Sequence, residues 1–155
     1  MKNLLVTFLA IALIFTACEK EEEPTPTTPT TPTTNYAFSC KIDGADFTDN
    51  DPVASVDAST DVLTIDAENG GNTIRMVIYN FSYRNVDEEI SLIVGNSISC
   101  AFVTKDGVDY TNTESGKLIF SETGNPVSGT FDVICANTQS ALVSVTEGEF
   151  VDVAY

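Results

Sequence analysis

The sequence predicts one all-β domain over residues 36–155, either an antiparallel β-sandwich or a barrel-like fold. Apolar and polar residues alternate with a period of two along many short segments, as they do in half-buried strands. Turn-forming residues separate these segments about every ten residues, which is typical of sandwiches and barrels. No segment keeps the helical period of about 3.6 residues for more than roughly two turns, so we expect no long helix.

The domain is expected to begin with a β-hairpin. In Tyr36–Ile42, apolar side chains alternate with small or polar ones. Asp43-Gly44 predicts a tight turn, and Ala45–Thr48 is expected to return as a short strand. Asp49–Pro52 then interrupts the strand pattern, because Asp, Asn and Pro favour turns.

A second group of strands is expected at Val53–Asp57, Asp61–Ala67 and Thr73–Tyr83. Asn69-Gly70 lies between the last two, and Asn-Gly is the strongest short signal for a hairpin. Thr73–Tyr83 is the longest of these segments and is apolar on both faces. It is therefore expected to be a central strand of a sheet, with one face partly open.

The rest of the domain is expected to consist of short strands between turn signals. These predicted strands are Ile90–Val94, Ser97–Val103, Val108–Thr111, Gly116–Glu122, Val127–Cys135, Ala141–Val145 and Glu149–Tyr155. Glu147-Gly148 is expected to bend the chain between the last two.

The first seventeen residues have the three parts of a secretory signal peptide. Met1–Asn3 is positively charged, Leu4–Phe15 is apolar and uncharged, and small residues follow before Cys18. The apolar segment is too short for a spanning helix, which needs roughly 20 residues. We therefore assign residues 1–17 as a cleaved signal peptide.

Phe15–Cys18 resembles a bacterial lipobox, in which the final cysteine receives lipid. The resemblance implies that Cys18 carries a diacylglyceryl group and an N-acyl chain such as palmitate. Several acyl chains together hold a protein stably on a membrane, whereas a single chain binds only marginally. The alternative is an ordinary secretory cut beside an unmodified Cys18, although bulky Phe15 would then stand where a small residue is required.

Residues 18–35 are expected to form a linker between the anchor and the domain. Glu19–Glu23 resembles the Lys-then-acidic signal of Bacteroidota lipoproteins that are exported to the cell surface, although it is also typical of a solvated linker. Pro24–Asn35 contains only Pro and Thr before its final Asn, which favours an extended, polyproline-like chain. The predicted location is the outer membrane, on the cell surface or, alternatively, on the periplasmic face.

Composition narrows the possible functions. The formal net charge is −16, and the chain has no His and no Trp. Such an acidic chain repels nucleic acid, which is therefore not an expected partner. Without His, catalysis by Ser-His-Asp or Cys-His within this chain and zinc sites built on imidazole are excluded. We assign no catalytic residue, metal or cofactor and expect a protein that is not an enzyme; paired carboxylates are the remaining enzymatic alternative.

Three cysteines remain if Cys18 carries lipid: Cys40, Cys100 and Cys135. An oxidising compartment permits one disulfide among them, in three possible pairings. The preferred pair is Cys100–Cys135, which would add about 3–4 kcal/mol of stability. The alternative is that all three are buried and act as small apolar residues.

Two groups of side chains are candidate ligand sites. Tyr79, Phe81 and Tyr83 alternate along one predicted strand and could form an aromatic platform for sugar rings, or could pack within the domain. A group of four acidic residues could bind calcium, but the surrounding sequence lacks the EF-hand pattern, so solvated turns are expected instead. These acidic residues are Asp43, Asp46, Asp49 and Asp51.

Three stretches, Phe38–Phe47, Ser128–Phe131 and Val145–Phe150, resemble motifs of a group of small Bacteroidota lipoproteins of uncharacterised function. The resemblance covers most of residues 36–155 and implies an all-β domain on a lipid anchor. It brings no catalytic residues with it.

These features together predict a membrane-anchored lipoprotein with a non-enzymatic extracytoplasmic β-domain that binds a partner or is structural. The alternatives are a surface module for glycan or polymer binding and a carboxylate-based hydrolase. The membrane is an expected partner through the N-terminal lipid, and the sequence does not identify a protein or glycan partner.

Overall fold

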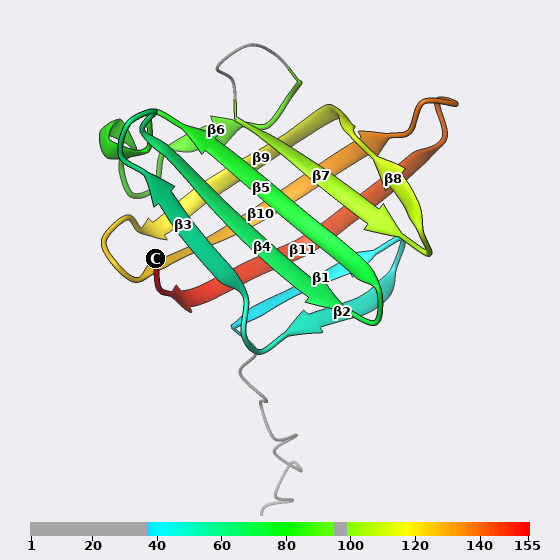
Figure 1. The fold of residues 1–155 in the computed structure, drawn as a ribbon, viewed down its shortest axis with the longest axis horizontal. Helices are drawn as coiled ribbons and strands as arrows, with labels where there is room; N and C mark the ends of the chain where they lie inside the picture. Colours follow the sequence, from blue (N-terminus) through cyan, green and yellow to red (C-terminus); the bar gives the residue numbers. More distant parts are fainter. Residues whose placement is uncertain (1–36, 95–98) are drawn as a thin grey trace, which may run out of the picture. The chain divides into compact units, whose positions relative to one another are not determined.

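Two antiparallel β-sheets face each other in the computed structural model, which describes residues 37–94 and 99–155. Figure 1 shows the five-stranded sheet in front of the six-stranded one, with the strands of one sheet crossing over those of the other. The predicted all-β sandwich is confirmed. The signal peptide, Cys18, the linker, Tyr36 and the start of the predicted strand Ser97–Val103 lie outside the described residues.

The six-stranded sheet has the strand order β2-β1-β11-β10-β9-β6. Its strands are β1 (Phe38–Ile42), β2 (Ala45–Asp49), β6 (Glu89–Ser91), β9 (Asn112–Glu122), β10 (Val127–Ala136) and β11 (Leu142–Val153). The predicted hairpin at the start of the domain is present, because β1 pairs with β2 from Phe38–Asp49 to Ile42–Ala45. The long strands β9, β10 and β11 form the centre of this sheet.

The five-stranded sheet has the order β3-β4-β5-β7-β8. Its strands are β3 (Val53–Asp57), β4 (Val62–Asn69), β5 (Asn72–Tyr79), β7 (Cys100–Lys105) and β8 (Val108–Tyr110). Strand β5 lies in the middle, as predicted from its two apolar faces. The β4–β5 turn consists of Gly70-Gly71, both with positive φ, whereas the preceding Asn69 pairs with Asn72 at the end of the ladder.

The core lies between the two sheets and consists of side chains from the inner face of each strand. Alternate residues of a strand point to opposite faces, so one set from each sheet is removed from water. The largest fully buried side chains are Phe38, Phe120, Phe131 and Phe150 of one sheet and Leu63, Ile65, Ile74, Met76 and Ile78 of the other. Burial of such apolar side chains is the main driving force for folding and contributes about 1.5–3 kcal/mol each.

The predicted strand Thr73–Tyr83 is wrong beyond Tyr79. Asn80 adopts a left-handed conformation with φ of 54°, which ends the strand, and Phe81–Tyr83 forms a single turn of 3₁₀ helix, η1. Phe81 is only 6% exposed and packs against Phe120, with ring centroids 5.8 Å apart. Burial of Phe81 in the core therefore takes precedence over the alternation that the sequence suggested.

The predicted bend at Glu147-Gly148 is a β-bulge within one continuous strand, β11. The pairing of β11 shifts by one residue here with β1 on one side and with β10 on the other. Glu147 has a φ of 53°, and its backbone N–H donates to Asp132 Oδ1 at 3.3 Å. The extra residue is thus accommodated without ending the strand.

Candidate functional site

A hollow of about 650 Å³ opens beside η1 at one end of the sandwich, and its volume is typical of ligand sites. It lies where η1, the β9–β10 turn and the C-terminus gather, at the left in Figure 1. We call it the η1 hollow. Its lining includes Val56, Asp61, Phe81, Tyr83, Arg84 and Tyr155.

Segment η1 is held in place by contacts with distant parts of the chain. The Phe81 N–H donates to the carbonyl oxygen of Asp61 at 3.1 Å, which ties η1 to the start of β4. The rings of Phe81 and Tyr155 meet edge to face, with centroids 5.6 Å apart and planes at 88°. Asn125 in turn fixes Tyr155, whose N–H donates to Asn125 Oδ1 at 3.1 Å. The walls of the hollow are therefore preformed.

Asp61 presents a carboxylate of fixed orientation in the hollow. Its Oδ1 accepts the Ser82 N–H at 3.0 Å, and its Oδ2 accepts the Ser82 hydroxyl at 2.8 Å. The two oxygens of a carboxylate together accept about four hydrogen bonds. Each oxygen of Asp61 therefore keeps capacity for a further donor.

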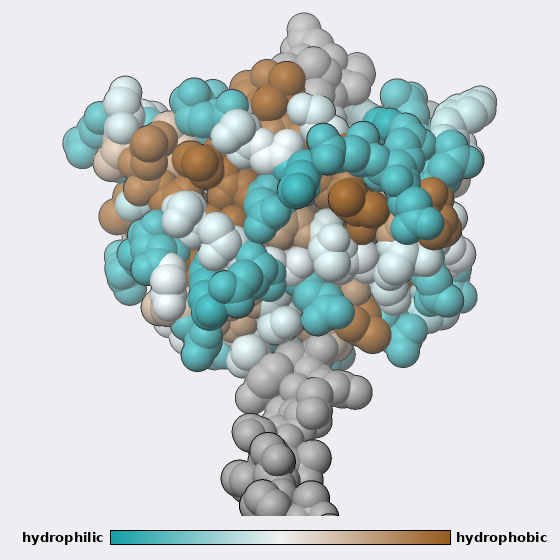
Figure 2. All heavy atoms as spheres, turned by 180° about the vertical axis from the view of Figure 1, so that it is seen from behind, coloured by the Kyte–Doolittle hydropathy of each residue, from teal (hydrophilic) through white to brown (hydrophobic). Residues whose placement is uncertain are grey.

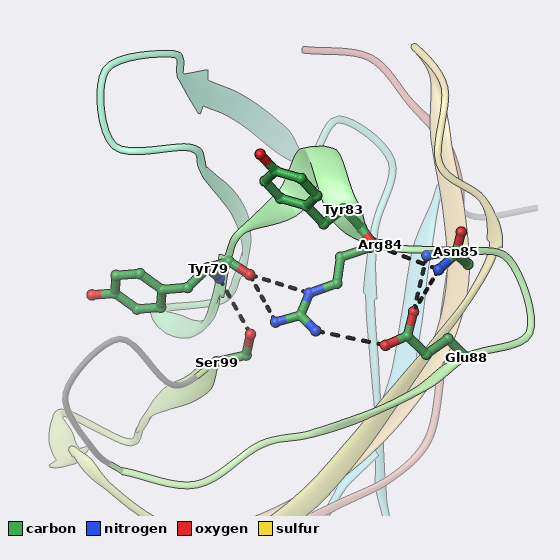
Figure 3. Close-up of polar contacts among 6 residues, drawn as sticks. All are labelled: Tyr79, Tyr83, Arg84, Asn85, Glu88 and Ser99. Carbon is green, nitrogen blue, oxygen red and sulfur yellow. Dashed lines mark hydrogen bonds and ion pairs between the residues drawn. The ribbon is translucent and has the colours of Figure 1, made fainter.

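Arg84 is committed to the protein by its own hydrogen bonds, as Figure 3 shows. Its Nε and Nη2 donate to the carbonyl oxygen of Tyr79 at 3.1 and 2.8 Å, and its Nη1 lies 3.8 Å from Glu88 Oε1. Hydrogen bonds from Asn85, together with the charge of Arg84, lower the pKa of Glu88. Arg84 therefore joins the end of β5, before η1, to the loop that follows η1. It also adds a positive charge to the lining of the hollow.

The structure does not bring Tyr79, Phe81 and Tyr83 together as the predicted aromatic platform. Tyr79 is half-buried on the outer face of the five-stranded sheet, Phe81 lies in the core, and Tyr83 is 79% exposed. Figure 3 shows the ring of Tyr79 apart from that of Tyr83, which extends from η1. The platform prediction is wrong because η1 replaces the last residues of the expected strand. Phe81 and Tyr83 nevertheless line the hollow.

Sequence reasoning missed Asp61, Arg84 and Tyr155 as members of this site. A polar run, Ser82–Asn85, directly after the apolar strand was a signal for a loop near Arg84. No local pattern marks Asp61 or Tyr155, because they reach the hollow only through the packing of separate strands.

The predicted Cys100–Cys135 disulfide is absent, because Cys40, Cys100 and Cys135 are free thiols in the described part of the chain. Strand pairing places Cys100 opposite Val77 on the outer face of its sheet, whereas Cys135 lies with the inward residues of β10. The Cys135 thiol donates to the Ala101 carbonyl oxygen at 3.4 Å.

Burial raises the pKa of all three thiols, that of Cys40 to about 12 and that of Cys135 to about 11. A nucleophilic cysteine needs the thiolate form. These cysteines therefore serve packing and not chemistry.

Two of the four acidic residues considered for calcium, Asp43 and Asp49, accept hydrogen bonds within turns and between strands. Asp49 accepts the backbone N–H groups of Asp51 and Glu68 at 2.9 and 2.8 Å, and Asp43 pairs with Lys105 at 2.7 Å. Within residues 37–94 and 99–155, no group of three or more Asp, Glu or Cys side chains is arranged to hold a metal ion.

Three smaller hollows, of about 320–380 Å³, lie on the outer face of the six-stranded sheet. Figure 2 views the molecule from this side and shows apolar and polar side chains interspersed. Lys41 and Glu147 on this face form an ion pair, with Nζ 2.7 Å from Oε2. The side chains around these hollows are therefore less suited to bind one ligand together than those around the η1 hollow.

No family model, curated protein or solved structure matches this chain. Among the described residues, no helix is long and apolar enough to cross a membrane.

Proposed function

We propose that this chain is a membrane-anchored lipoprotein whose extracytoplasmic β-domain binds a ligand without transforming it. The anchor is Cys18, preceded by a signal peptide and followed by an extended linker. The observation that carries the binding role is the η1 hollow, in which aromatic, acidic and basic side chains come together from separate segments of the chain.

The lining of the hollow favours binding over catalysis. Hydrolysis of a glycoside by two carboxylates needs them on opposite sides of the bond, roughly 5–9 Å apart. Among the described residues that line the hollow, Asp61 has the one side-chain carboxylate, and Ser82 donates to both of its oxygens. The chain also has no His, the residue that most often serves as general acid or base.

Surface capture of a glycan or polymer is the second candidate function. Tyr83 and Tyr155 favour it, since both line the hollow and remain exposed to solvent, by 79% and 37%. Aromatic side chains of this kind present an apolar face together with a polar hydroxyl.

The anchor is tested by labelling cells with radioactive palmitate. The wild-type protein is expected to incorporate the label and to remain in the membrane, whereas Cys18→Ala should lose both properties. Cys40→Ala is the matched control, because it removes a cysteine of the domain and should leave labelling intact. Release of unlabelled wild-type protein would overturn the proposed anchor.

The side of the membrane is tested by treating intact cells with a protease. Surface exposure predicts loss of the domain from wild-type cells. Full protection of a normally lipidated protein would place the domain on the periplasmic face and contradict surface capture.

The binding role is tested by recording amide NMR spectra of the mature lipidated chain in a detergent without a sugar headgroup. A panel of sugars, short peptides, diamines and acidic sugars is added in turn. At least one class should shift the amides of Asp61, Ser82 and Tyr83. If no class shifts them, the proposed binding function is wrong.

A further inference from the structure

We propose that the η1 hollow binds the ring of a neutral sugar, with Asp61 accepting a ring hydroxyl and Tyr83 and Tyr155 covering the apolar face of the ring. This inference rests on the proposed binding function and specifies the chemistry of its ligand.

The first argument is that the Asp61 carboxylate can accept further hydrogen bonds. Ser82 occupies one acceptor position on each carboxylate oxygen, at 3.0 and 2.8 Å, and so fixes the plane of the group. Each oxygen therefore keeps a free acceptor position, and a hydroxyl group on a sugar ring is a suitable donor for it.

The second argument is the charge of the lining. Asp61 and Arg84 are the charged residues among the described side chains around the hollow, and their charges are opposite. An anionic ligand would be repelled by Asp61 and by a chain of net charge −16. Arg84 does not offset this repulsion, because the Tyr79 carbonyl oxygen and Glu88 already occupy its guanidinium group. A neutral ligand with many hydroxyl groups avoids the repulsion.

The third argument is the aromatic surface. Phe81 lies in the wall of the hollow with Tyr155 set edge to face against it, and Tyr83 stands on the rim with 79% of its surface exposed. The C–H face of a sugar ring is apolar and packs well on an aromatic ring, while the tyrosine hydroxyls remain available for hydrogen bonds. The hollow therefore combines an apolar surface with a directed acceptor.

The test uses the amide NMR titration described above with four neutral probes, the methyl glycosides of glucose, galactose, mannose and N-acetylglucosamine. At least one is expected to shift the amides of Asp61, Ser82, Tyr83 and Tyr155. Asp61→Asn should weaken that binding about tenfold or more, because it loses the charge-assisted hydrogen bonds. Asn tolerates the positive φ of position 61, so the variant is expected to fold.

Asp57→Asn is the matched control. The Asp57 carboxylate likewise accepts the N–H and hydroxyl of one serine, Ser59, at 2.8 and 2.6 Å, but it does not line the hollow. This variant should bind the glycoside as the wild type does. Tyr83→Ala should weaken binding several-fold, since its exposed ring has no packing role.

The outcomes separate this inference from the proposed function. Shifts of the hollow amides by glucuronate, putrescine or a peptide alone would overturn the neutral sugar and leave the binding role intact. Equal weakening by Asp61→Asn and Asp57→Asn would overturn the role of Asp61. If no probe of any class shifts these amides, both the inference and the proposed function fail.

Discussion

Two side chains of β10 accept hydrogen bonds from backbone N–H groups at the bulges of β11. At these positions the regular pairing between strands is interrupted. The Ser128 hydroxyl accepts the Asp152 N–H at 2.9 Å, and Asp132 Oδ1 accepts the Glu147 N–H at 3.3 Å. Both donors belong to residues with positive φ, which marks the two positions where β11 departs from regular geometry. Single polar side chains therefore supply acceptors for backbone N–H groups that the irregular strand leaves without a ladder partner.

Ser128→Ala is expected to lower the free energy of unfolding by about 1–3 kcal/mol. Ser128 is 8% exposed, so water cannot readily replace its hydroxyl as the acceptor for Asp152. Urea denaturation measures the change. Ser55→Ala, at an exposed position of the edge strand β3, is the control and should change stability by less than about 0.5 kcal/mol. Equal effects of the two substitutions would contradict this role of Ser128.

Gly148, at the bulge of β11, is required by space. A Cβ atom at this position would lie 2.5 Å from the Phe131 carbonyl oxygen and 2.6 Å from its ring. Both contacts are far shorter than van der Waals distances, and Phe131 is itself fixed in the core. The close approach of β11 and β10 here therefore depends on the absence of a side chain.

Gly148→Ala is expected to destabilise the domain by about 1–3 kcal/mol or more, because the added methyl overpacks the core beside Phe131. Thermal unfolding followed by circular dichroism is the measurement. Gly124→Ala is the matched control, since its Cβ would meet only the Pro126 carbonyl oxygen, at 3.9 Å. A melting temperature of Gly148→Ala equal to that of the control would refute the steric argument.

An ion pair joins the β1–β2 turn of one sheet to the end of β7 in the other. Lys105 Nζ lies 2.7 Å from Asp43 Oδ2, while Asp43 Oδ1 accepts the Ser144 N–H at 2.9 Å. The hydrogen bond from Lys105, followed by that from Ser144, lowers the pKa of Asp43. Asp43 thus links three strands at one end of the sandwich.

Asp43→Asn is expected to destabilise the domain at pH 7 by less than about 1 kcal/mol, because both partners are about a third exposed. The folded pKa of Asp43 lies below its unfolded value of about 3.9. Its stabilisation is therefore complete above that value and is lost as the pH falls through the folded pKa. Melting temperatures of the wild type and variant should converge below about pH 4; a constant difference would contradict the prediction.

Protection of the cysteines is a property of the complete sandwich. Cys40, Cys100 and Cys135 lie on three different strands, and at most 8% of the surface of each is exposed. Raised pKa values further reduce the thiolate fraction of each at neutral pH. Reactivity of these thiols therefore reports on global opening of the fold.

Iodoacetamide is expected to label none of these three cysteines in the native protein and all three in concentrated urea without reductant. Mass spectrometry counts the labels, and lipidated Cys18 is excluded from the count. Rapid labelling under native conditions would contradict the buried core. Two cysteines that resist labelling in urea would show that a disulfide forms.

Much of the strand pattern was predictable because it depends on local alternation. Val53–Asp57 forms β3 with the predicted bounds, and the Asp43-Gly44 turn joins β1 to β2 as expected. Strand ends were less predictable. The Phe81 side chain continues the apolar pattern of β5, yet contacts with Phe120 and Tyr155 draw it into the core through a change of backbone direction.

The candidate site was predictable only in part, from the aromatic residues Phe81 and Tyr83. Asp61 lies some twenty residues before Ser82, and Tyr155 lies at the far end of the domain, so no short motif joins them. Their meeting depends on which strands become neighbours.

The all-β class and most strand positions follow from the sequence, because the period of two and the turn residues are local properties of the chain. The signal peptide and lipidation of Cys18 are likewise predicted from local pattern alone. The partition into two sheets, the bulges of β11, the free cysteines and the η1 hollow became evident only in the folded domain. These features depend on contacts between residues far apart in sequence, and packing in the core selects among backbone paths that local preference leaves nearly equal.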